Sequence, residues 1–226
     1  MLVKNWMSKK VVTADVDDSM QEATKLLKEH NIRMLPVMKK NKLVGIVTDR
    51  DIKEASASDA TTLEIHELLY LVSKIRVKEI MTKDPVTVSP DLTIEETAQI
   101  LLDKKISGVP VMDQKGKIVG TITQTDIFKA LISLTGLAKR GIQFAFELED
   151  RPGSIKDVAD IIRKFGGRMA SILSSYDGAP TGRRNVYIRM YDIDRSRLDQ
   201  LIKELKGKAK VIYMVDHKEN RREIYE

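Results

Sequence analysis

The sequence contains an internal repeat, and this repeat limits the possible folds more than any other feature of the chain. Residues 3–38 align with residues 77–112 at an offset of 74, and residues 42–55 align with residues 117–130 at an offset of 75. Identical residues mark the two copies at Met7 and Met81, Pro36 and Pro110, Gly45 and Gly120, Thr48 and Thr123, and Asp51 and Asp126. Such self-similarity indicates supersecondary units that cannot bury their hydrophobic faces alone. The two copies are therefore expected to pack on one another.

Each copy is predicted to contain a strand, a helix, two short strands and a second helix. An extended segment at 11–13 or 86–88 leads into a helix that opens with a capping box, Ser19-x-x-Glu22 or Thr93-x-x-Glu96. Apolar residues then recur at helical spacing, as at Ile94, Ala98 and Leu101. The short strands are expected at 35–38 and 43–47, and again at 109–112 and 118–122. The second helix is expected to begin near Asp49 or Gln124, so the order β-α-β-β-α occurs twice.

Both copies carry Pro-Val-Met and then Lys-Leu/Ile-Val-Gly-x-Val/Ile-Thr-x-x-Asp, and this pattern resembles a tandem pair of CBS motifs, the cystathionine β-synthase regulatory module. The resemblance implies CBS motif 1 at 1–56, a linking helix at 57–76 and CBS motif 2 at 77–135. Within the linking segment, His66-Glu67-x-x-Tyr70 has only part of the zinc-protease motif. Its second histidine is missing, so no metal site is expected.

The last third of the chain has a different pattern. Alternating apolar residues from Ile142 predict a half-buried strand, residues 150–153 form a turn, and a helix begins near Ser154. Two strands, a second helix and a final strand follow, and this β-α-β-β-α-β order is ferredoxin-like. The acidic-x-Pro-Gly-x-apolar entry at 150–155 resembles that of an ACT domain, which would occupy 141–216 and leave 217–226 as a charged tail.

The predicted fold class is therefore α+β, a tandem CBS pair followed by a ferredoxin-like ACT domain. This arrangement resembles the acetoin-utilisation AcuB-type proteins. The six residues 136–141 that join the two parts begin and end with glycine. They are either a plain linker or a short hinge that transmits movement from one part to the other.

Composition excludes several classes of function. The 226 residues include no cysteine, which excludes disulfides and thiol chemistry, and no apolar run approaches the ~20 residues that span a bilayer. No signal segment opens the chain, so a cytoplasmic protein without membrane contact is expected. No catalytic constellation is present, and we expect no enzyme activity.

The net charge of +6 is spread along the chain, apart from Arg183-Arg184 and a tail with Lys218, Arg221 and Arg222. These clusters are either solvated charges or a nucleic-acid contact.

The Thr-x-x-Asp segments, Thr48 with Asp51 and Thr123 with Asp126, lie where a strand runs into a helix. They either cap the helix or bind a ligand, because a helix N-terminus attracts phosphate and a carboxylate can accept both hydroxyls of a ribose. The CBS resemblance implies the second role, with Asp on the ribose and Thr near the phosphate. It also implies base pockets at Val12, Ile32, Arg33, Met34 and Pro36, and at Val86, Ile106, Ser107, Gly108 and Pro110. Arg33 is either a phosphate ligand or a surface cation, whereas Ser107 and Gly108 would leave space without charge.

The ACT resemblance implies a second ligand site at Asp150, Pro152, Gly153 and Ser154. There Gly153 would let an amino acid's carboxylate approach the helix and Asp150 would take its amino group. Alternatively, Pro152-Gly153 only makes the turn.

The sequence as a whole predicts a non-enzymatic regulator in which the CBS pair senses AMP, ADP, ATP or S-adenosylmethionine and is coupled to the ACT domain. No cofactor is required, a homodimer is expected, and the AcuB-type resemblance implies acetoin or carbon metabolism with an unknown target protein. One alternative is an ACT-based amino-acid sensor with a structural CBS pair. Another is a nucleic-acid-binding regulator that uses Arg183, Arg184 and the tail, although we do not expect nucleic acid as a partner.

Overall fold

A computed structural model describes residues 1–58 and 74–225, and these divide into two compact units, Met1–Phe128 and Lys129–Glu226. Most of the expected linking helix at 57–76, including His66, lies outside the described residues. The boundary between the units falls within helix α6 (Gln124–Leu134), which begins in the first unit and ends in the second.

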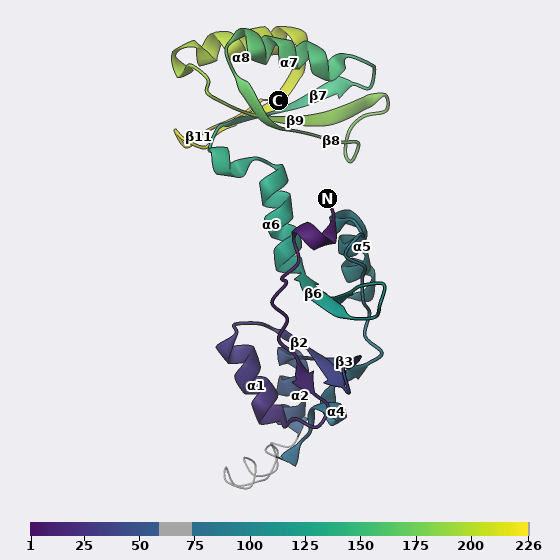
Figure 1. Cartoon of the computed structure of the whole chain (residues 1–226). Coiled ribbons are helices and arrows are strands. Elements are labelled where there is room, and N and C mark those ends of the chain that lie inside the picture. The colour runs from purple at the N-terminus through teal and green to yellow at the C-terminus, as the bar shows by residue number, and fades with distance from the viewer. Residues whose placement is uncertain (59–73, 226) are drawn as a thin grey trace. The chain divides into compact units, whose positions relative to one another are not determined.

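The first unit contains both sequence copies, and each has the predicted helix, two strands and second helix (Figure 1). The first copy consists of η1 (Val3–Asn5), β1 (Ala14–Asp15), α1 (Met20–Glu29), β2 (Met34–Lys39), β3 (Lys42–Thr48) and α2 (Asp49–Ser58). The second consists of α4 (Val77–Ile80), β4 (Thr82–Lys83), α5 (Ile94–Lys104), β5 (Gly108–Met112), β6 (Ile118–Thr123) and α6. The expected extended segment before the first helix is a strand only at Ala14–Asp15 in the first copy. In the second copy it is a single parallel bridge between Val88 and Val111.

Both predicted capping boxes are present. Ser19 Oγ accepts from Glu22 N, and the Glu22 carboxylate accepts from Ser19 N at 2.7 Å. The Thr93 and Glu96 pair repeats this arrangement, with Thr93 N 2.8 Å from Glu96 Oε2. These contacts satisfy backbone donors that the helix itself leaves unpaired, which fixes where α1 and α5 begin.

Each copy packs against the segment that opens the other copy. Val77 N donates to Asp18 O at 2.9 Å in the first copy, and Val3 N donates to Leu92 O at 2.9 Å in the second. Strand β4 pairs with β3 to extend the sheet to the order β1-β2-β3-β4, and the equivalent segment of the other copy forms a bridge from Ser8 to Thr121. Both Val3 and Val77 are fully buried. Each copy therefore completes its core with the segment that lies ahead of the other.

The repeated Gly and Met pairs have their explanation in this exchange. A Cβ on Gly45 would lie 2.6 Å from Met81 Sδ and 2.9 Å from Thr82 O. A Cβ on Gly120 would lie 2.6 Å from Met7 Sδ and 2.9 Å from Ser8 O. Both distances are shorter than real Cβ atoms show, so only glycine lets the exchanged segment approach this closely.

The second unit places a five-stranded sheet against two helices (Figure 1). Its elements are η2 (Leu137–Lys139), β7 (Ile142–Glu149), α7 (Ser154–Lys164), β8 (Arg168–Ser175), β9 (Arg183–Tyr191), η3 (Arg195–Arg197), α8 (Leu198–Lys208), β10 (Lys210–Asp216) and β11 (Arg221–Ile224). The strand order is β11-β10-β7-β9-β8, and all neighbours are antiparallel. Residues up to β10 follow the predicted β-α-β-β-α-β order.

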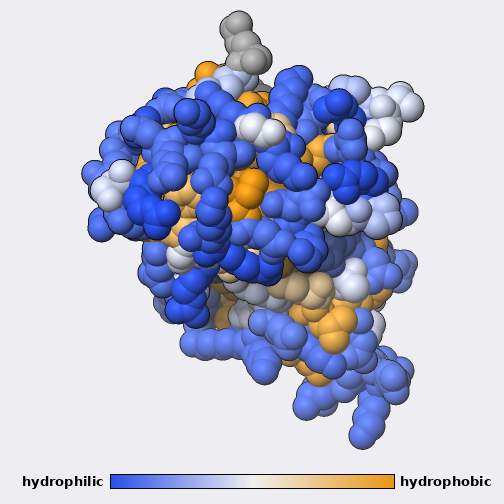
Figure 2. All heavy atoms as spheres, turned by 90° about the horizontal axis from the view of Figure 1, so that it is seen from above, coloured by the Kyte–Doolittle hydropathy of each residue, from blue (hydrophilic) through white to orange (hydrophobic). Residues whose placement is uncertain are grey.

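Alternation along the strands forms the core of this unit. Phe144, Phe146, Ile188 and Met190 are fully buried with apolar residues of α7 and α8, such as Ile162 and Leu205. Side chains on the outer surface of the two helices are mostly hydrophilic, with isolated hydrophobic ones between them (Figure 2). The helices are thus amphipathic, as their sequence spacing predicts.

Two segments of the second unit differ from the sequence expectations. The residues expected to form a charged tail at 217–226 include strand β11, in which Val215 pairs with Arg222 and Tyr213 with Ile224. Three of its four residues, Arg221, Arg222 and Glu223, are charged, and charged side chains are favoured on a strand at the edge of a sheet. Strand β9 begins at Arg183, so the Arg183-Arg184 pair, expected to be solvated charges or a nucleic-acid contact, belongs to the sheet.

The expected linker at 136–141 is held against the second unit. Thr135 O accepts hydrogen bonds from Arg189 Nε at 2.6 Å and from Ser171 Oγ at 2.9 Å. A Cβ on Gly136 would lie 2.8 Å from Ala170 Cβ, and one on Gly141 would lie 1.8 Å from Met190 O. The two glycines are therefore required for close packing within this unit, and neither is free to act as an open hinge there.

Candidate ligand-binding sites

The Thr-x-x-Asp segment of the first copy forms a compact junction between β3 and α2. Thr48 N and Thr48 Oγ1 donate to Asp51 Oδ2 at 2.8 and 2.7 Å, and Asp51 N donates to Thr48 Oγ1 at 3.3 Å. These three hydrogen bonds are those that the capping interpretation requires. Both bonds from Thr48 reach Asp51 Oδ2. The other carboxylate oxygen, Asp51 Oδ1, has no hydrogen bond within the described residues. A half-exposed carboxylate oxygen thus remains available at the start of α2.

The second copy repeats this junction between β6 and α6. Thr123 N donates to Asp126 Oδ2 at 3.0 Å, and Thr123 Oγ1 donates to the same oxygen at 2.7 Å. Capping and ligand binding do not exclude each other here, because the cap orients the carboxylate at the helix N-terminus. That end of a helix also favours anions through its dipole and free amides.

The residues before each Pro-Val-Met lie beside the same helix N-terminus. Asp49 N donates to Arg33 O at 3.2 Å, and Gln124 N donates to Ser107 O at 2.9 Å. In the sheet register, Met34 pairs with Thr48 and Gly108 pairs with Thr123. The structure therefore brings together, in each copy, the two stretches that the sequence assigned to one pocket.

The other predicted pocket residues are less directly connected to these junctions. Pro36 pairs with Ile46, and Pro110 pairs with Thr121 while its carbonyl accepts from Val88 N at 3.1 Å. Both prolines are buried. Ile32 and Ile106 follow the first helix of their copies and are half-buried, as are the strand-leading residues Val12 and Val86. Val12 and Ile32 pack on the core of the first copy.

The two junctions differ in charge and in space. The Arg33 side chain is exposed and has no ion pair within the described part of the chain. Ser107 occupies the same position in the second copy and carries no charge. A Cβ on Gly108 would lie 3.0 Å from Thr123 Cγ2 and 3.1 Å from Ile122 O. Gly108 is thus needed for close packing of β5 on β6.

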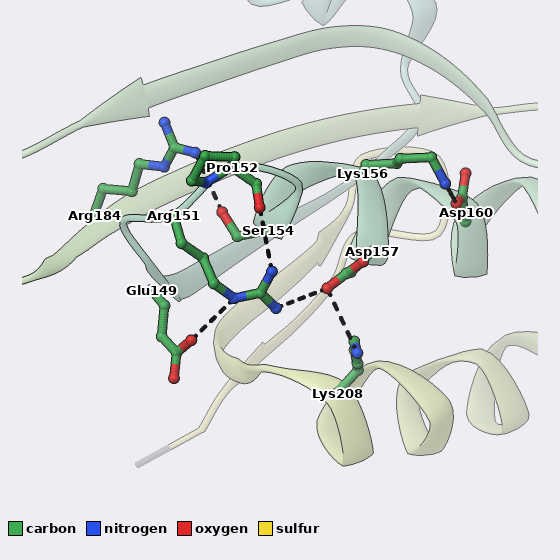
Figure 3. Close-up of polar contacts among 9 residues, drawn as sticks. All are labelled: Glu149, Arg151, Pro152, Ser154, Lys156, Asp157, Asp160, Arg184 and Lys208. Atoms are coloured by element: carbon green, nitrogen blue, oxygen red, sulfur yellow. Dashed lines mark hydrogen bonds and ion pairs between the residues drawn. The ribbon is translucent and has the colours of Figure 1, made fainter.

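The predicted ACT residues lie in the turn before α7 and at its first residue, where Figure 3 shows Pro152 and Ser154. Gly153 has φ of 87°, in the left-handed region that glycine adopts without strain, which accounts for its place in the turn. No side chain caps the helix at this residue. The space beside Gly153 is open, since a Cβ there would meet only Arg151 Nη1, at 3.9 Å. The turn and ligand interpretations of Pro152-Gly153 therefore remain compatible.

Two residues that the sequence interpretation did not place here already contact Asp150 and Ser154. Arg184 Nη2 donates to Ser154 Oγ at 3.2 Å, and Arg184 Nε lies 3.6 Å from Asp150 Oδ1. Tyr176 OH donates to Asp150 Oδ1 at 3.3 Å. Arg184 Nε is buried and has no hydrogen-bond partner. The only sequence signal was the Arg183-Arg184 pair, because the register that brings β9 beside this turn is not visible in the sequence.

Ion pairs hold the neighbouring charges at this end of the unit. Arg151 donates to Glu149 Oε2 at 3.1 Å and to Asp157 Oδ2 at 2.9 Å, and Lys208 lies 3.5 Å from the same Asp157 oxygen (Figure 3). The hydrogen bond from Arg151 lowers the pKa of Asp157. Arg183 pairs with Glu147 at 3.1 Å. Asp157 is thus already engaged, and Arg183 faces an acidic partner.

The described residues contain neither a candidate metal site nor a candidate membrane span. No group of His, Cys, Asp and Glu residues there could hold a metal ion. Nor does this part of the chain contain a helix that is both long and apolar enough to cross a membrane.

Comparison with known proteins locates the similarity in the first unit. The CBS domain family model matches residues 3–58 and 77–133. The chain is 33% identical over 135 residues to a CBS domain-containing protein of Dictyostelium discoideum, covering 59% of this chain and 93% of the relative. It is 37% identical over 125 residues to an inosine-5'-monophosphate dehydrogenase of Korarchaeum cryptofilum, covering 55% of this chain but only 23% of the dehydrogenase.

A solved structure is similar over the same share of the chain. This is the CBS domain pair of protein MJ0100 in complex with 5′-methylthioadenosine and S-adenosyl-L-methionine. It is 36% identical with a TM-score of 0.50, and the match covers 58% of this chain and 95% of that structure.

Proposed function

Because the chain belongs to the CBS domain family, we propose that it is a non-enzymatic regulatory protein whose CBS pair binds an adenosine nucleotide or adenosyl compound. The observation that carries this proposal is the repeated junction of Thr48 with Asp51 and of Thr123 with Asp126. Each junction presents a carboxylate at a helix N-terminus beside the residues that precede Pro-Val-Met. The adenosyl ligands of the similar MJ0100 pair support the choice of ligand class.

In this proposal, the carboxylate of Asp51 or Asp126 accepts the two hydroxyls of the ribose. A carboxylate has about four acceptor positions, so Asp51 can keep both bonds from Thr48 and still accept a diol through Oδ1. The base would lie among the residues around Ile32 to Pro36 or Ile106 to Pro110. The cap thereby serves the ligand, since it holds the carboxylate in one orientation before the ligand arrives.

We assign different ligands to the two sites from their charge. Arg33 offers an exposed guanidinium without an ion pair in residues 1–58 and 74–225, and its planar fork suits a phosphate. Ser107 offers only a hydroxyl at the equivalent position. The first site would therefore take a nucleotide such as AMP, ADP or ATP, and the second would take an adenosyl compound without phosphate or a nucleotide held less tightly.

We propose further that the second unit is a ferredoxin-like ACT domain that responds to this ligand. Its element order and the turn at 150–153 support the assignment. Residues 135–141 directly follow α6 and are anchored by Arg189 and Ser171, so this stretch has little freedom within its unit to absorb movement. A homodimer in the cytoplasm and an unknown target protein complete the proposal. A role in acetoin or carbon metabolism is added by the AcuB-type resemblance alone.

The experiment exchanges each aspartate for asparagine, Asp51→Asn and Asp126→Asn, singly and together. The amide oxygen of asparagine can accept the bonds from threonine, so the cap is largely retained while the second carboxylate oxygen and its charge are lost. Calorimetric titration with AMP, ATP, S-adenosylmethionine and 5′-methylthioadenosine should show a loss of about 1.5–3 kcal/mol at the altered site.

The matched control is Glu22→Gln, which makes the same change in the capping box of α1, where Glu22 Oε2 accepts from Ser19 N and Oγ. This variant should bind every compound as the original protein does. If the double aspartate variant also keeps full affinity for all four compounds, the ribose assignment is wrong and the two junctions serve only as caps.

A second candidate function is suggested by Arg184. Its buried Nε has no hydrogen bond within the described residues and only a 3.6 Å ion pair with Asp150, so an amino-acid carboxylate could be held between Arg184 and the start of α7. This would make the chain an amino-acid sensor with a structural CBS pair. Thermal shift with the twenty amino acids distinguishes the two, because a ligand that binds the folded state raises its apparent stability. Stabilisation by an amino acid that Arg184→Met abolishes, without any by adenosyl compounds, would favour this second function.

A further inference from the structure

A hollow of about 730 Å³ on the second unit lies apart from the residues assigned to ligands above. Its lining includes five cationic side chains and one acidic one, namely Lys139, Arg140, Arg168, Arg195, Lys218 and Asp192. The volume falls within the range that small-molecule sites occupy. We refer to these six residues as the basic hollow.

Most of the positive charge in the basic hollow is not neutralised. Arg195 is committed to the buried carboxylate of Asp216, with hydrogen bonds of 2.7 and 3.0 Å. Arg168 lies 3.7 Å from Asp192, and both side chains are more than half exposed, so this pair is weak. The side chains of Lys139, Arg140 and Lys218 form no ion pair among the residues that the structure describes, and only the backbone N–H of Lys218 donates to Asp216. At least three positive charges therefore face the same hollow without compensation.

A second hollow of the same unit shows that this is not a general property of its surface. That hollow, of about 380 Å³, also has five cationic residues, but three acidic residues line it as well. Its ion pairs are Arg151 with Glu149 and Asp157, Lys208 with Asp157, and Arg183 and Lys210 with Glu147. Its cations are thus largely neutralised by the protein itself, which those of the basic hollow are not.

The backbone of the basic hollow is held in place by the fold. Arg140 and Asp192 have φ of 45° and 57°, in a region that residues other than glycine seldom adopt. Gly141, the residue after Arg140, packs directly on Met190 O, and a Cβ on this glycine would lie 1.8 Å from that oxygen. Backbone strain of this kind persists only where the surrounding structure imposes it. The cations are therefore presented by a fixed segment.

The side chains are also partly ordered. Lys139 Nζ lies 5.2 Å from the centre of the Tyr191 ring, and the Arg168 guanidinium carbon lies 5.4 Å from it. Both distances suit a cation–π interaction.

We propose that the basic hollow binds a compact anion that carries several negative charges, of the polyphosphate class. Three uncompensated cations, with Arg168 as a fourth that a weak pair can release, match the charge of a polyphosphate better than that of a single carboxylate. Arginine and lysine both bind phosphate oxygens, arginine through two parallel hydrogen bonds. This site is independent of the CBS junctions and of the turn at Gly153.

The test uses the full chain, with inorganic tripolyphosphate as the probe and calorimetry at low and at physiological salt. The informative variant is Lys139→Gln/Arg140→Gln/Lys218→Gln, which removes the three uncompensated charges. The matched control is Lys9→Gln/Lys40→Gln/Lys203→Gln, which lowers the net charge equally at exposed lysines outside the hollow. A thermal melt of each variant verifies that it is folded.

We expect the original chain and the control to bind tripolyphosphate alike. The informative variant should bind it about 3- to 100-fold more weakly, because each of the three exposed cations contributes about 1.5- to 5-fold. Equal losses in both triple variants would mean that the anion responds only to net charge, and the proposal would be wrong. It would also be wrong if the informative variant kept full affinity. Loss of single-stranded oligonucleotide binding in that variant, without any binding of tripolyphosphate to the original chain, would identify the hollow as a nucleic-acid contact instead.

Discussion

Replacement of Gly45 or Gly120 by alanine tests whether the two copies exchange their leading segments as the structure has them. At Gly45 the added methyl group would lie 2.6 Å from Met81 Sδ and 2.9 Å from Thr82 O. The methionine can move, because its side chain is flexible. The backbone oxygen can move only if strand β4 shifts away from β3, which weakens the pairing of Gly45 with Lys83 and of Ile46 with Thr82.

The magnitude follows from two opposing effects. Overpacking of this kind typically costs about 1–3 kcal/mol, and a contact with the backbone belongs to the upper half of that range. Alanine gains about 0.5–1 kcal/mol over glycine in a strand, because the unfolded chain loses freedom. The net expectation is that Gly45→Ala lowers the free energy of unfolding by about 1–2 kcal/mol. Gly120→Ala should do the same, because its distances to Met7 Sδ and Ser8 O are also 2.6 and 2.9 Å.

The assay is urea denaturation followed by far-ultraviolet circular dichroism, with Gly207→Ala as the control. A Cβ on Gly207, within α8, meets nothing within 4 Å, so this variant should be neutral or more stable by up to about 1 kcal/mol. Adding Met81→Ala to Gly45→Ala should recover only part of the loss, since the contact with Thr82 O remains. If Gly45→Ala and Gly120→Ala are both as stable as the original chain, the close approach of the exchanged segments is refuted.

Two further predictions concern buried charges of the second unit. Burial opposes ionisation of Asp216, but hydrogen bonds from Arg195 and from the backbone N–H groups of Lys218 and Glu219 outweigh it and lower the pKa of this carboxyl group. A lowered folded-state pKa contributes stability above the unfolded value of about 3.9, and this contribution is lost as the pH falls through the folded value. Asp216→Asn should therefore cost about 1.5–3 kcal/mol at pH 7 in urea titrations, and the difference from the original chain should shrink below about pH 4; a difference that is constant down to pH 2 would contradict this. Arg189 is only 4% exposed, its Nη1 has no hydrogen-bond partner, and burial lowers its pKa. Arg189→Met should leave stability unchanged or raise it by about 1–3 kcal/mol, because Ser171 still donates to Thr135 O and no charge remains to be desolvated. A loss as large as that of Arg189→Ala, which also leaves a cavity, would show that the guanidinium is net stabilising.

The local structure of this protein could be predicted because its signals lie within a few residues of one another. The capping boxes at Ser19 and Thr93 start their helices where the spacing indicates, since the partners are three residues apart. The starts of α2 and α6 at Asp49 and Gln124, and that of α7 at Ser154, also agree with the sequence. The repeat further indicated that two equivalent Thr-x-x-Asp junctions exist.

Contacts between distant residues were decided only by the tertiary structure. The sequence shows that Met7 and Gly120 recur as Met81 and Gly45, but not that each methionine lies against the glycine of the other copy. Likewise, nothing near Asp150 in the sequence indicates that Arg184 lies beside it. The three consecutive charged residues at 221–223 give no sign of strand β11, which exists because β10 offers an edge to pair with.

The physical reason is the same in each case. Helix caps, turns and strand alternation depend on bonds between neighbours in the chain, so the sequence by itself determined them. Other features depend on which hydrophobic faces meet, namely the sheet register, the exchange of segments and the burial of Arg189. Hydrophobic burial is non-directional, so any apolar surface of the right shape can serve as the partner. The sequence therefore determined which elements form and where the candidate adenosyl sites begin. Only the tertiary structure decided which charges are neutralised, and hence that those of the basic hollow are not.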